Sequence, residues 1–276
     1  MKLSHKITLF FTVLIITTIN SQDKLKGNKE VTTEDRTISD FNKLEIIDDV
    51  DVFLSFNEIQ SVSVETDANL QEAVITEVNN GTLVIKLSTK IVRKKELAVH
   101  IKVNRKLKEI NGYNSAKIIS KNSLAIDSLT INTFDNSKLD LKLNSKTLQI
   151  NSKKSSDLKL EVLSNSITIN AEENSDIKGA FDAKGAFFTL LDRASINVEG
   201  SSDIFEIETL GNTSFKGKDF KSKEVLVNAT NSSSTHINAT KTIDLRVKNS
   251  AEVYLYSNPK ITITEFFDKA SLNKRD

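Results

Sequence analysis

The densest group of acidic side chains comprises Asp48, Asp49 and Asp51, with Asp35 and Asp40 upstream. Hard cations such as calcium take about six to eight oxygen ligands, so these carboxylates are candidate ligands for a weak calcium site. No glycine-containing calcium loop frames the cluster. We therefore interpret the acids as solvated charges at a strand end, and we predict no metal site.

The three histidines lie far apart in the sequence, at His5, His100 and His236. None has a neighbouring histidine or cysteine at the spacing that zinc ligands adopt. A catalytic serine or threonine needs a positioned base beside it, and no such pairing is evident. We predict that the chain has no catalytic residues and no cofactor.

Three aromatic residues are candidate contacts for a saccharide, because flat apolar ring faces suit sugars. Tyr254 and Tyr256 share the outward face of a predicted strand, and Phe187 interrupts an otherwise polar outward column. The alternative interpretation is that these rings only cover the surface of a sheet.

The structure that positions these side chains is indicated by a sequence pattern that repeats about every 19 residues from Ile110 onward. Each copy has apolar residues spaced by two, which places them on one face of a short strand. A single copy cannot bury its strands, whereas stacked copies close a continuous core, so the pattern predicts a β-solenoid. The apolar column comprises Ile110, Ile131, Ile150, Ile169, Phe188, Ile207, Val227, Leu245 and Ile263, and the small column six residues later comprises Ala116, Ser137, Ser156, Ser175, Ala194, Thr213, Ser233 and Ala251.

Two columns, one of asparagines and the small column, are best explained by stacking. The residue after the first strand is asparagine in five copies, and aligned amides are expected to hydrogen-bond into a ladder. The small column is expected to occupy tight corners with no room for larger side chains. The five asparagines are Asn111, Asn132, Asn151, Asn170 and Asn228.

Polysaccharide lyases and hydrolases built on β-helices need carboxylates or basic residues that converge on one groove. Asp157, Asp176 and Glu252 share the spacer column before the second strand, but other copies place lysine, serine or histidine there. This mixture is typical of a solvated face. A degenerate polysaccharide-active β-helix is therefore kept as an alternative only.

The charge balance excludes one class of partner. The 38 Lys and Arg residues nearly match the 37 Asp and Glu residues, the net charge is +1, and the two signs are interspersed. Nucleic-acid recognition depends on basic patches that face phosphates, so we expect no nucleic-acid partner. The absence of cysteine excludes disulfides and a lipid-modified cysteine.

The N-terminus has the layout of a secretory signal peptide. Lys2 and Lys6 precede an apolar stretch from Ile7 to Ile19, which is shorter than the roughly 20 residues of a spanning helix. We predict a signal peptide at 1–21 with cleavage near Ser21; the alternative is an uncleaved anchor. No later apolar run is long enough to span a bilayer, so we expect an exported protein, periplasmic or at the cell surface.

Four segments follow from these patterns. After the signal peptide, the polar residues 22–37 are expected to form a flexible leader, and residues 38–107 a β-rich block in which Asp67 caps a short helix. Residues 108–276 are expected to form the solenoid, with Phe266 and Phe267 as a cap on its last turn.

Several segments resemble one known family. The segments are Phe41–Ile47, Val50–Leu54, Val62–Thr66, Gly81–Leu87 and Leu107–Ile118. They are similar to the family described as "putative auto-transporter adhesin, head GIN domain", found mainly in exported proteins of the Bacteroidota. The resemblance covers residues 38–272 and implies a right-handed, single-stranded parallel β-helix with an N-terminal β-rich cap. It names no ligand.

The function expected from the sequence is therefore interaction. We expect an exported, non-catalytic, adhesin-like module of the cell envelope, whose partner is an envelope protein or a glycan. The rival interpretations are a periplasmic envelope-stress or signalling partner and the degenerate polysaccharide-active β-helix.

Overall fold

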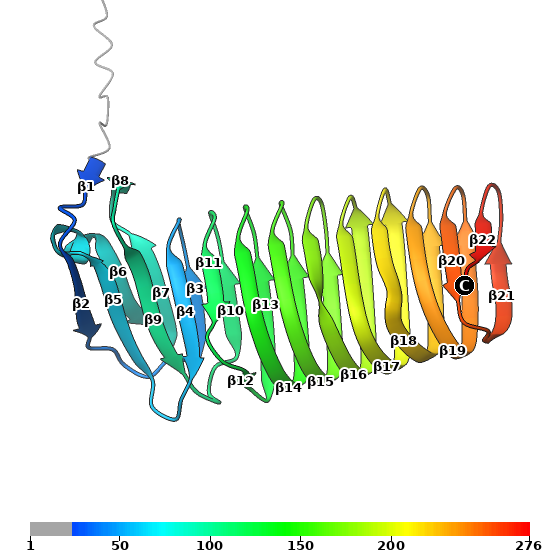
Figure 1. The fold of residues 1–276 in the computed structure, drawn as a ribbon, viewed down its shortest axis with the longest axis horizontal. Helices are drawn as coiled ribbons and strands as arrows, with labels where there is room; N and C mark the ends of the chain where they lie inside the picture. The colour runs from blue at the N-terminus through cyan, green and yellow to red at the C-terminus, as the bar shows by residue number, and fades with distance from the viewer. Residues whose placement is uncertain (1–23) are drawn as a thin grey trace, which may run out of the picture.

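The computed structural model describes residues 24–276, and the predicted signal peptide lies outside these residues. The described chain contains strands β1 to β22 and a single short 3-10 helix, η1 (Ala68–Ala73). The strands stack side by side into an elongated β-solenoid (Figure 1). The predicted all-β solenoid is confirmed.

The regular part of the solenoid begins with short strands and continues with long ones. Each long strand contains the second strand of one sequence repeat and the first strand of the next, joined through a bend. All neighbours pair in parallel, so the sequence repeats stack in register. The strands are β10 (Glu109–Gly112), β11 (Lys117–Ser120), β12 (Leu124–Ala125), β13 (Ser128–Thr133), β14 (Lys138–Ser152), β15 (Asp157–Ala171), β16 (Asp176–Asp192), β17 (Ser195–Gly211), β18 (Ser214–Thr230) and β19 (Ser234–Lys248).

The two broad sides of the solenoid are named here for later use. The first face carries the outward side chains of the segments aligned with Ser128–Thr133. The second face carries those of the segments aligned with Lys138–Lys142.

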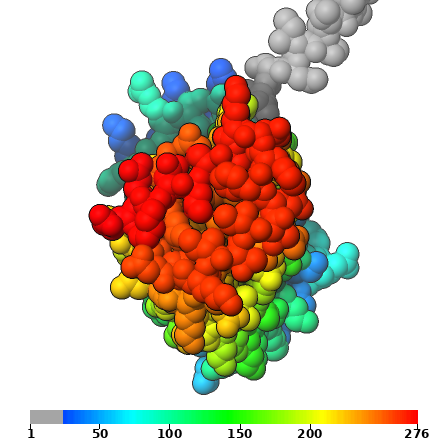
Figure 2. All heavy atoms as spheres, turned by 90° about the vertical axis from the view of Figure 1, so that its right-hand side faces the viewer, coloured from blue at the N-terminus to red at the C-terminus, as the bar shows by residue number. Residues whose placement is uncertain are grey.

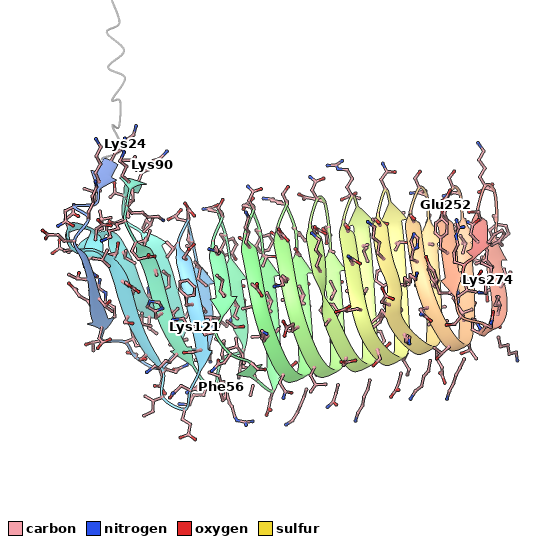
Figure 3. The ribbon with its side chains drawn as sticks, in the orientation of Figure 1. Lys24, Phe56, Lys90, Lys121, Glu252 and Lys274 are labelled. Carbon is pink, nitrogen blue, oxygen red and sulfur yellow. The ribbon has the colours of Figure 1, made fainter. Side chains whose placement is uncertain are left out.

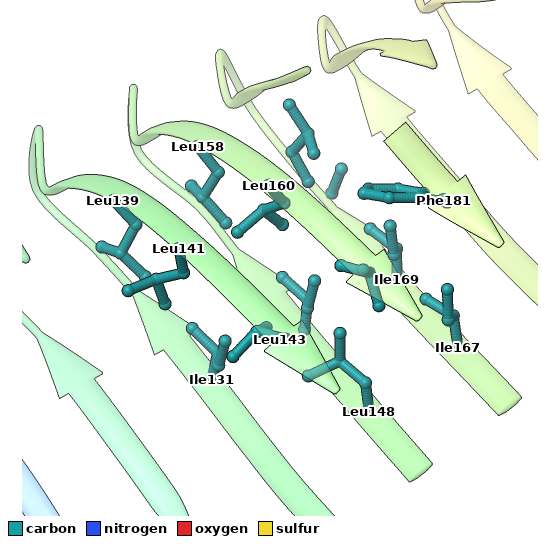
Figure 4. Close-up of a cluster of buried hydrophobic side chains, with 14 of the residues drawn as sticks. Ile131, Leu139, Leu141, Leu143, Leu148, Leu158, Leu160, Ile167, Ile169 and Phe181 are labelled. Carbon is teal, nitrogen blue, oxygen red and sulfur yellow. The ribbon is translucent and has the colours of Figure 1, made fainter. Parts of the chain in front are cut away.

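The core consists of the inward apolar columns, which Figure 4 shows for the middle rungs. Ile131, Ile150 and Ile169 are fully buried and follow one another in register. Further along, phenylalanines replace aliphatic residues and pack edge to face, with 5.1 Å between the ring centroids of Phe188 and Phe205. The inward assignment of the apolar column is confirmed as far as Leu245.

The small column lies at tight corners, as predicted. The two residues before Ser137, Asp135 and Asn136, have positive φ angles of 54° and 65°, which turns the chain sharply. The Ser137 hydroxyl donates to the Phe134 carbonyl oxygen at 2.5 Å, and Ser156 makes the same bond at 2.8 Å with the carbonyl three residues back. Both serines are buried, so a larger side chain would have no space.

The asparagine ladder forms across four of the five predicted positions. The Asn132 amide donates to Asn111 at 2.7 Å, Asn151 donates to Asn132 at 2.7 Å, and Asn170 donates to Asn151 at 2.9 Å. Thr189 and Glu208 occupy the next two rungs, so Asn228 is separated from the ladder.

The N-terminal block extends the parallel ladders in an order that differs from the sequence. On one side the order is β7 (Thr82–Leu87), β3 (Lys43–Ile46), β10, and on the other it is β9 (Leu97–Val103), β4 (Asp51–Phe56), β11. The rung nearest the N-terminal end therefore comes later in the chain than the rung beside it. This crossover explains why the regular repeat is absent from residues 38–107.

Antiparallel strands close the N-terminal end. β5 (Ser61–Asp67) pairs with β9, β2 (Val31–Arg36) pairs with β5, and β6 (Val74–Asn79) pairs with β7. The flexible leader expected at 22–37 is therefore wrong for β2. Its polar side chains suit an edge strand because most of them face solvent, and the Arg36 guanidinium anchors the strand by donating to the Gln71 side chain at 2.7 Å.

Helix η1 begins directly after Asp67, as expected, but the Asp67 side chain does not cap it. The buried carboxylate instead accepts hydrogen bonds from the backbone N–H groups of Lys29, Lys95 and Glu96. Asp67 thus joins the segment before β2 to the loop before β9.

The C-terminal end consists of β20 (Glu252–Tyr256), β21 (Lys260–Phe266) and β22 (Ser271–Lys274), and it faces the viewer in Figure 2. Ile263 is 53% exposed, and Phe266 and Phe267 are 39% and 56% exposed. The expected phenylalanine cap is wrong, because both rings remain exposed to solvent and no further rung of the described residues covers Ile263.

Candidate functional site: the faces of the solenoid

The acidic cluster does not assemble into a metal site. Asp51 forms an ion pair with Lys117 at 3.1 Å, and Asp48 accepts a hydrogen bond from the Leu87 backbone at 3.3 Å. Among residues 24–276 no three carboxylate, histidine or cysteine side chains are placed to hold a metal ion.

The two described histidines lie in separate clusters. His100 contacts Glu65 at 2.8 Å and Lys121 at 3.2 Å, and its ring stacks on Phe53 with 5.4 Å between centroids. Lys121 lies on the N-terminal half of the solenoid in Figure 3, whereas His236 belongs to β19, which lies toward the C-terminal end in Figure 1. This arrangement fits a surface cluster and supplies no nucleophile.

A groove of about 800 Å³ follows the second face across the middle rungs. Several of its charged side chains form ion pairs, as Lys159 does with Asp140 at 3.3 Å and Glu161 with Lys142 at 2.9 Å. The hydrogen bond to Asp176 raises the pKa of Lys178 above its ordinary value. Of the spacer-column acids, Asp176 forms an ion pair with Lys178, whereas Glu252 accepts a hydrogen bond from Tyr254 outside the groove.

The tyrosines on the last rungs point outward, as predicted, but their ring faces are covered. Tyr254 lies between His236, whose ring centroid is 4.4 Å away, and the guanidinium of Arg275 at 5.0 Å. The ammonium of Lys218 lies 5.6 Å from the centroid of Tyr256. These rings form a stack along the solenoid and leave no uncovered Tyr254 face for a sugar.

The contacts within this stack shift the pKa values of Tyr254 and His236. The hydrogen bond that Tyr254 donates to Glu252 at 2.6 Å raises the pKa of the tyrosine. Burial, with Lys216 and Arg275 nearby, lowers the pKa of His236, so the neutral ring is favoured. Nδ1 of His236 and the Tyr256 hydroxyl share a hydrogen bond at 3.0 Å.

The first face carries a different arrangement around Phe187. Its side chain is 36% exposed and lines a shallow pocket of about 220 Å³. We call this pocket the Phe187 pocket. Glu206 and Leu226 lie in register with Phe187 on the following rungs, and they also line a second shallow pocket that adjoins the Phe187 pocket.

The polar rim of the Phe187 pocket has no internal partners. Within the part of the chain that the structure describes, none of its six polar side chains forms a side-chain hydrogen bond or an ion pair, whereas Asp140, Lys159 and Glu161 in the second-face groove are paired. Their donors and acceptors are free to bind a ligand. The rim comprises Thr168, Thr189, Glu206, Glu208, Asn228 and Arg246.

The sequence indicated Phe187 but not its surroundings. The rim residues come from five successive strands, β15 to β19, and from two different outward columns. Only the exact register, including the irregular pairing of β17 with β18, places Asn228 and Arg246 in the lining of the pocket that contains Phe187. An approximate repeat period in the sequence does not show which residues of neighbouring rungs line the same pocket.

The fold and these surfaces define a β-solenoid interaction module. The family model described as "putative auto-transporter adhesin, head GIN domain" matches residues 40–180 and 161–259. The chain belongs to this family. Within residues 24–276 no helix is long and apolar enough to cross a membrane.

Solved structures share this fold over nearly the whole chain. A protein from Parabacteroides distasonis described as a "putative lipid binding protein" is 20% identical, with a TM-score of 0.69, and the match covers 92% of this chain and 100% of that chain. A "putative adhesin" from Parabacteroides merdae is 19% identical with a TM-score of 0.67 and the same coverage. Another from Parabacteroides distasonis is 18% identical with a TM-score of 0.64, covering 91% of this chain and 100% of that chain. No curated protein matches the chain.

Proposed function

We propose that this chain is an exported, non-catalytic module of the cell envelope that binds a saccharide through the Phe187 pocket. The observation that carries the proposal is a pocket that an exposed aromatic ring lines together with six polar side chains without internal partners. Saccharides bind to such sites because the ring packs against C–H groups while the rim hydrogen-bonds the hydroxyls. The parallel sheet supplies a rigid support for both.

The shape of the pocket favours a saccharide over a lipid. An acyl chain is bound most effectively in an enclosed apolar cavity. The Phe187 pocket is shallow, and carboxylates, an amide and a guanidinium line it. Its chemistry fits a hydroxyl-rich ligand, and its place on the flat side of a solenoid leaves room for a long chain of sugars.

A glycan array tests this proposal. The wild-type chain is expected to bind a defined group of saccharides, and Phe187→Ala to weaken that binding about tenfold because the apolar contact is lost. Leu163→Ala is the matched control, since Leu163 is also an exposed apolar side chain, 57% exposed, but lies outside the pocket. Equal affinity of the two variants would exclude the Phe187 pocket.

Two further experiments address the rival functions. Release of reducing or unsaturated sugar ends from a polysaccharide panel would contradict the non-catalytic assignment. External protease added to intact cells is expected to cleave a surface-exposed chain. Complete protection would instead favour a periplasmic envelope-stress or signalling partner.

A further inference from the structure

Two basic segments that are far apart in the sequence meet at the N-terminal end. Residues 24–29 and 90–95 contain seven cations and no acidic residue, although the whole chain has a net charge of only +1. We call these two segments the N-terminal basic patch. Its cations are Lys24, Lys26, Lys29, Lys90, Arg93, Lys94 and Lys95.

The patch is held together by a pairing that brings like charges side by side. β1 (Lys24–Lys26) and β8 (Lys90–Arg93) form a separate two-stranded parallel sheet in which Lys24 pairs with Lys90 and Lys26 with Arg93. Figure 3 shows Lys24 and Lys90 together where this small sheet projects from the solenoid. Like charges opposite one another destabilise a sheet, so this arrangement is opposed by its own electrostatics.

No carboxylate of the described residues neutralises the patch through a salt bridge. Lys94 reaches only the backbone oxygen of Asp49, at 3.4 Å. Glu30 and Glu96 follow the two segments but contact Asn28 and a backbone N–H instead. The ammonium and guanidinium groups therefore remain available to an external anion.

A buried carboxylate fixes the position of the patch. Asp67 is fully buried and binds the backbone of Lys29 and Lys95, one from each segment. Burial would raise the pKa of Asp67, but the hydrogen bonds from Lys95, Lys29 and Glu96 outweigh it and lower the pKa. At Gly27 an added Cβ would lie 2.4 Å from the Asp67 carboxyl carbon, so only glycine permits this approach.

We propose that the N-terminal basic patch docks this chain on an anionic phospholipid bilayer. Clusters of four to eight cations bind anionic lipid surfaces, with roughly 1 kcal/mol for each cation near the surface. Val92 is 39% exposed and lies between Lys90 and Arg93, so it adds an apolar contact at the level of the lipid headgroups. This apolar contact favours a lipid surface over a soluble polyanion, which offers no apolar region.

The test uses vesicles of phosphatidylcholine with and without phosphatidylglycerol, and the chain purified as its host exports it. The wild type is expected to bind only the anionic vesicles, and more weakly at high salt because ions screen the attraction. The double variant Lys24→Glu with Lys90→Glu is expected to bind at least about tenfold more weakly. Lys260→Glu with Lys269→Glu, at the opposite end, is the matched control and is expected to bind as the wild type does.

A second variant separates docking from folding. Lys24→Gln with Lys90→Gln removes the repulsion between β1 and β8, so its thermal stability is expected to equal or exceed that of the wild type while vesicle binding weakens. The proposal is overturned if both glutamate double variants bind alike, or if the wild type binds the two vesicle types equally. Binding to dextran sulfate without binding to anionic vesicles would also overturn it.

Discussion

Substitution of Asn151 by alanine tests whether the asparagine ladder stabilises the solenoid. Asn151 donates to Asn132 at 2.7 Å and accepts from Asn170 at 2.9 Å, so Asn151→Ala removes two side-chain hydrogen bonds. Each contributes about 0.5 to 1.5 kcal/mol net. The neighbouring amides are only half-buried and regain some bonding to water, so the expected loss in the free energy of unfolding is about 1 to 2 kcal/mol.

Asn228→Ala is the matched control, because Asn228 occupies the same column but Thr189 and Glu208 separate it from the ladder. Its substitution is expected to change stability by no more than about 0.5 kcal/mol. Thermal melts followed by circular dichroism measure both variants, and the expected decrease in Tm for Asn151→Ala is about 2 to 8 °C. Equal melting of the two variants would refute the ladder's contribution.

Three other predictions concern the core, the corners and pH. Ile150→Asp places a charge in the buried column and is expected to unfold several neighbouring turns, with new proteolytic sites around it. If this variant melts at the same temperature as the wild type, Ile150 does not face inward. Ser156→Ala is expected to lower the free energy of unfolding by about 1 kcal/mol, because the Ser156 hydroxyl donates a hydrogen bond. Ser233→Ala is expected to leave stability unchanged or to raise it, because the buried Ser233 hydroxyl has no partner. Chemical denaturation measures both variants, and equal losses of stability would contradict this reasoning. Because the pKa of His236 is lowered in the folded chain, the contribution of this residue to stability is complete above about pH 6.5 and is lost as the pH falls through that value. The stability difference between the wild type and His236→Phe should therefore shrink or reverse from pH 7.5 to about 5. A difference that does not change with pH would contradict this prediction.

The regular part of the fold was predictable because each rung repeats the same physical problem. Inward residues such as Ile150 must be apolar, and corner residues such as Ser156 must be small, so both leave columns in the sequence. The asparagine column was also predictable, but its end was not. Whether Asn228 joins the ladder depends on the two intervening rungs, where Thr189 and Glu208 cannot continue an amide chain.

The N-terminal end was less predictable because its contacts join distant segments. The polar strand β2 looked like a leader, since an edge strand needs few apolar residues. The reversed spatial order of β3 and β7 leaves no fixed period in the sequence. The N-terminal basic patch arises only when Asp67 brings Lys29 and Lys95 together.

The surface site was predictable only in part. Phe187 was conspicuous as an aromatic residue in a polar column. Tyr254 and Tyr256 met the same criterion, yet in the structure His236, Arg275 and Lys218 cover their rings. Sequence parity assigns a side chain to the outward face, but it does not show what lies over that side chain.

The central claim is that a saccharide binds at the Phe187 pocket, and one fluorescence titration tests it most directly. The chain contains no tryptophan, so Phe187→Trp introduces a single indole reporter into the pocket. A saccharide selected on the array is expected to change its emission saturably, whereas the indole introduced by Leu163→Trp, outside the pocket, should not respond. Unchanged emission from Phe187→Trp, while calorimetry on the same sample shows binding, would contradict the account.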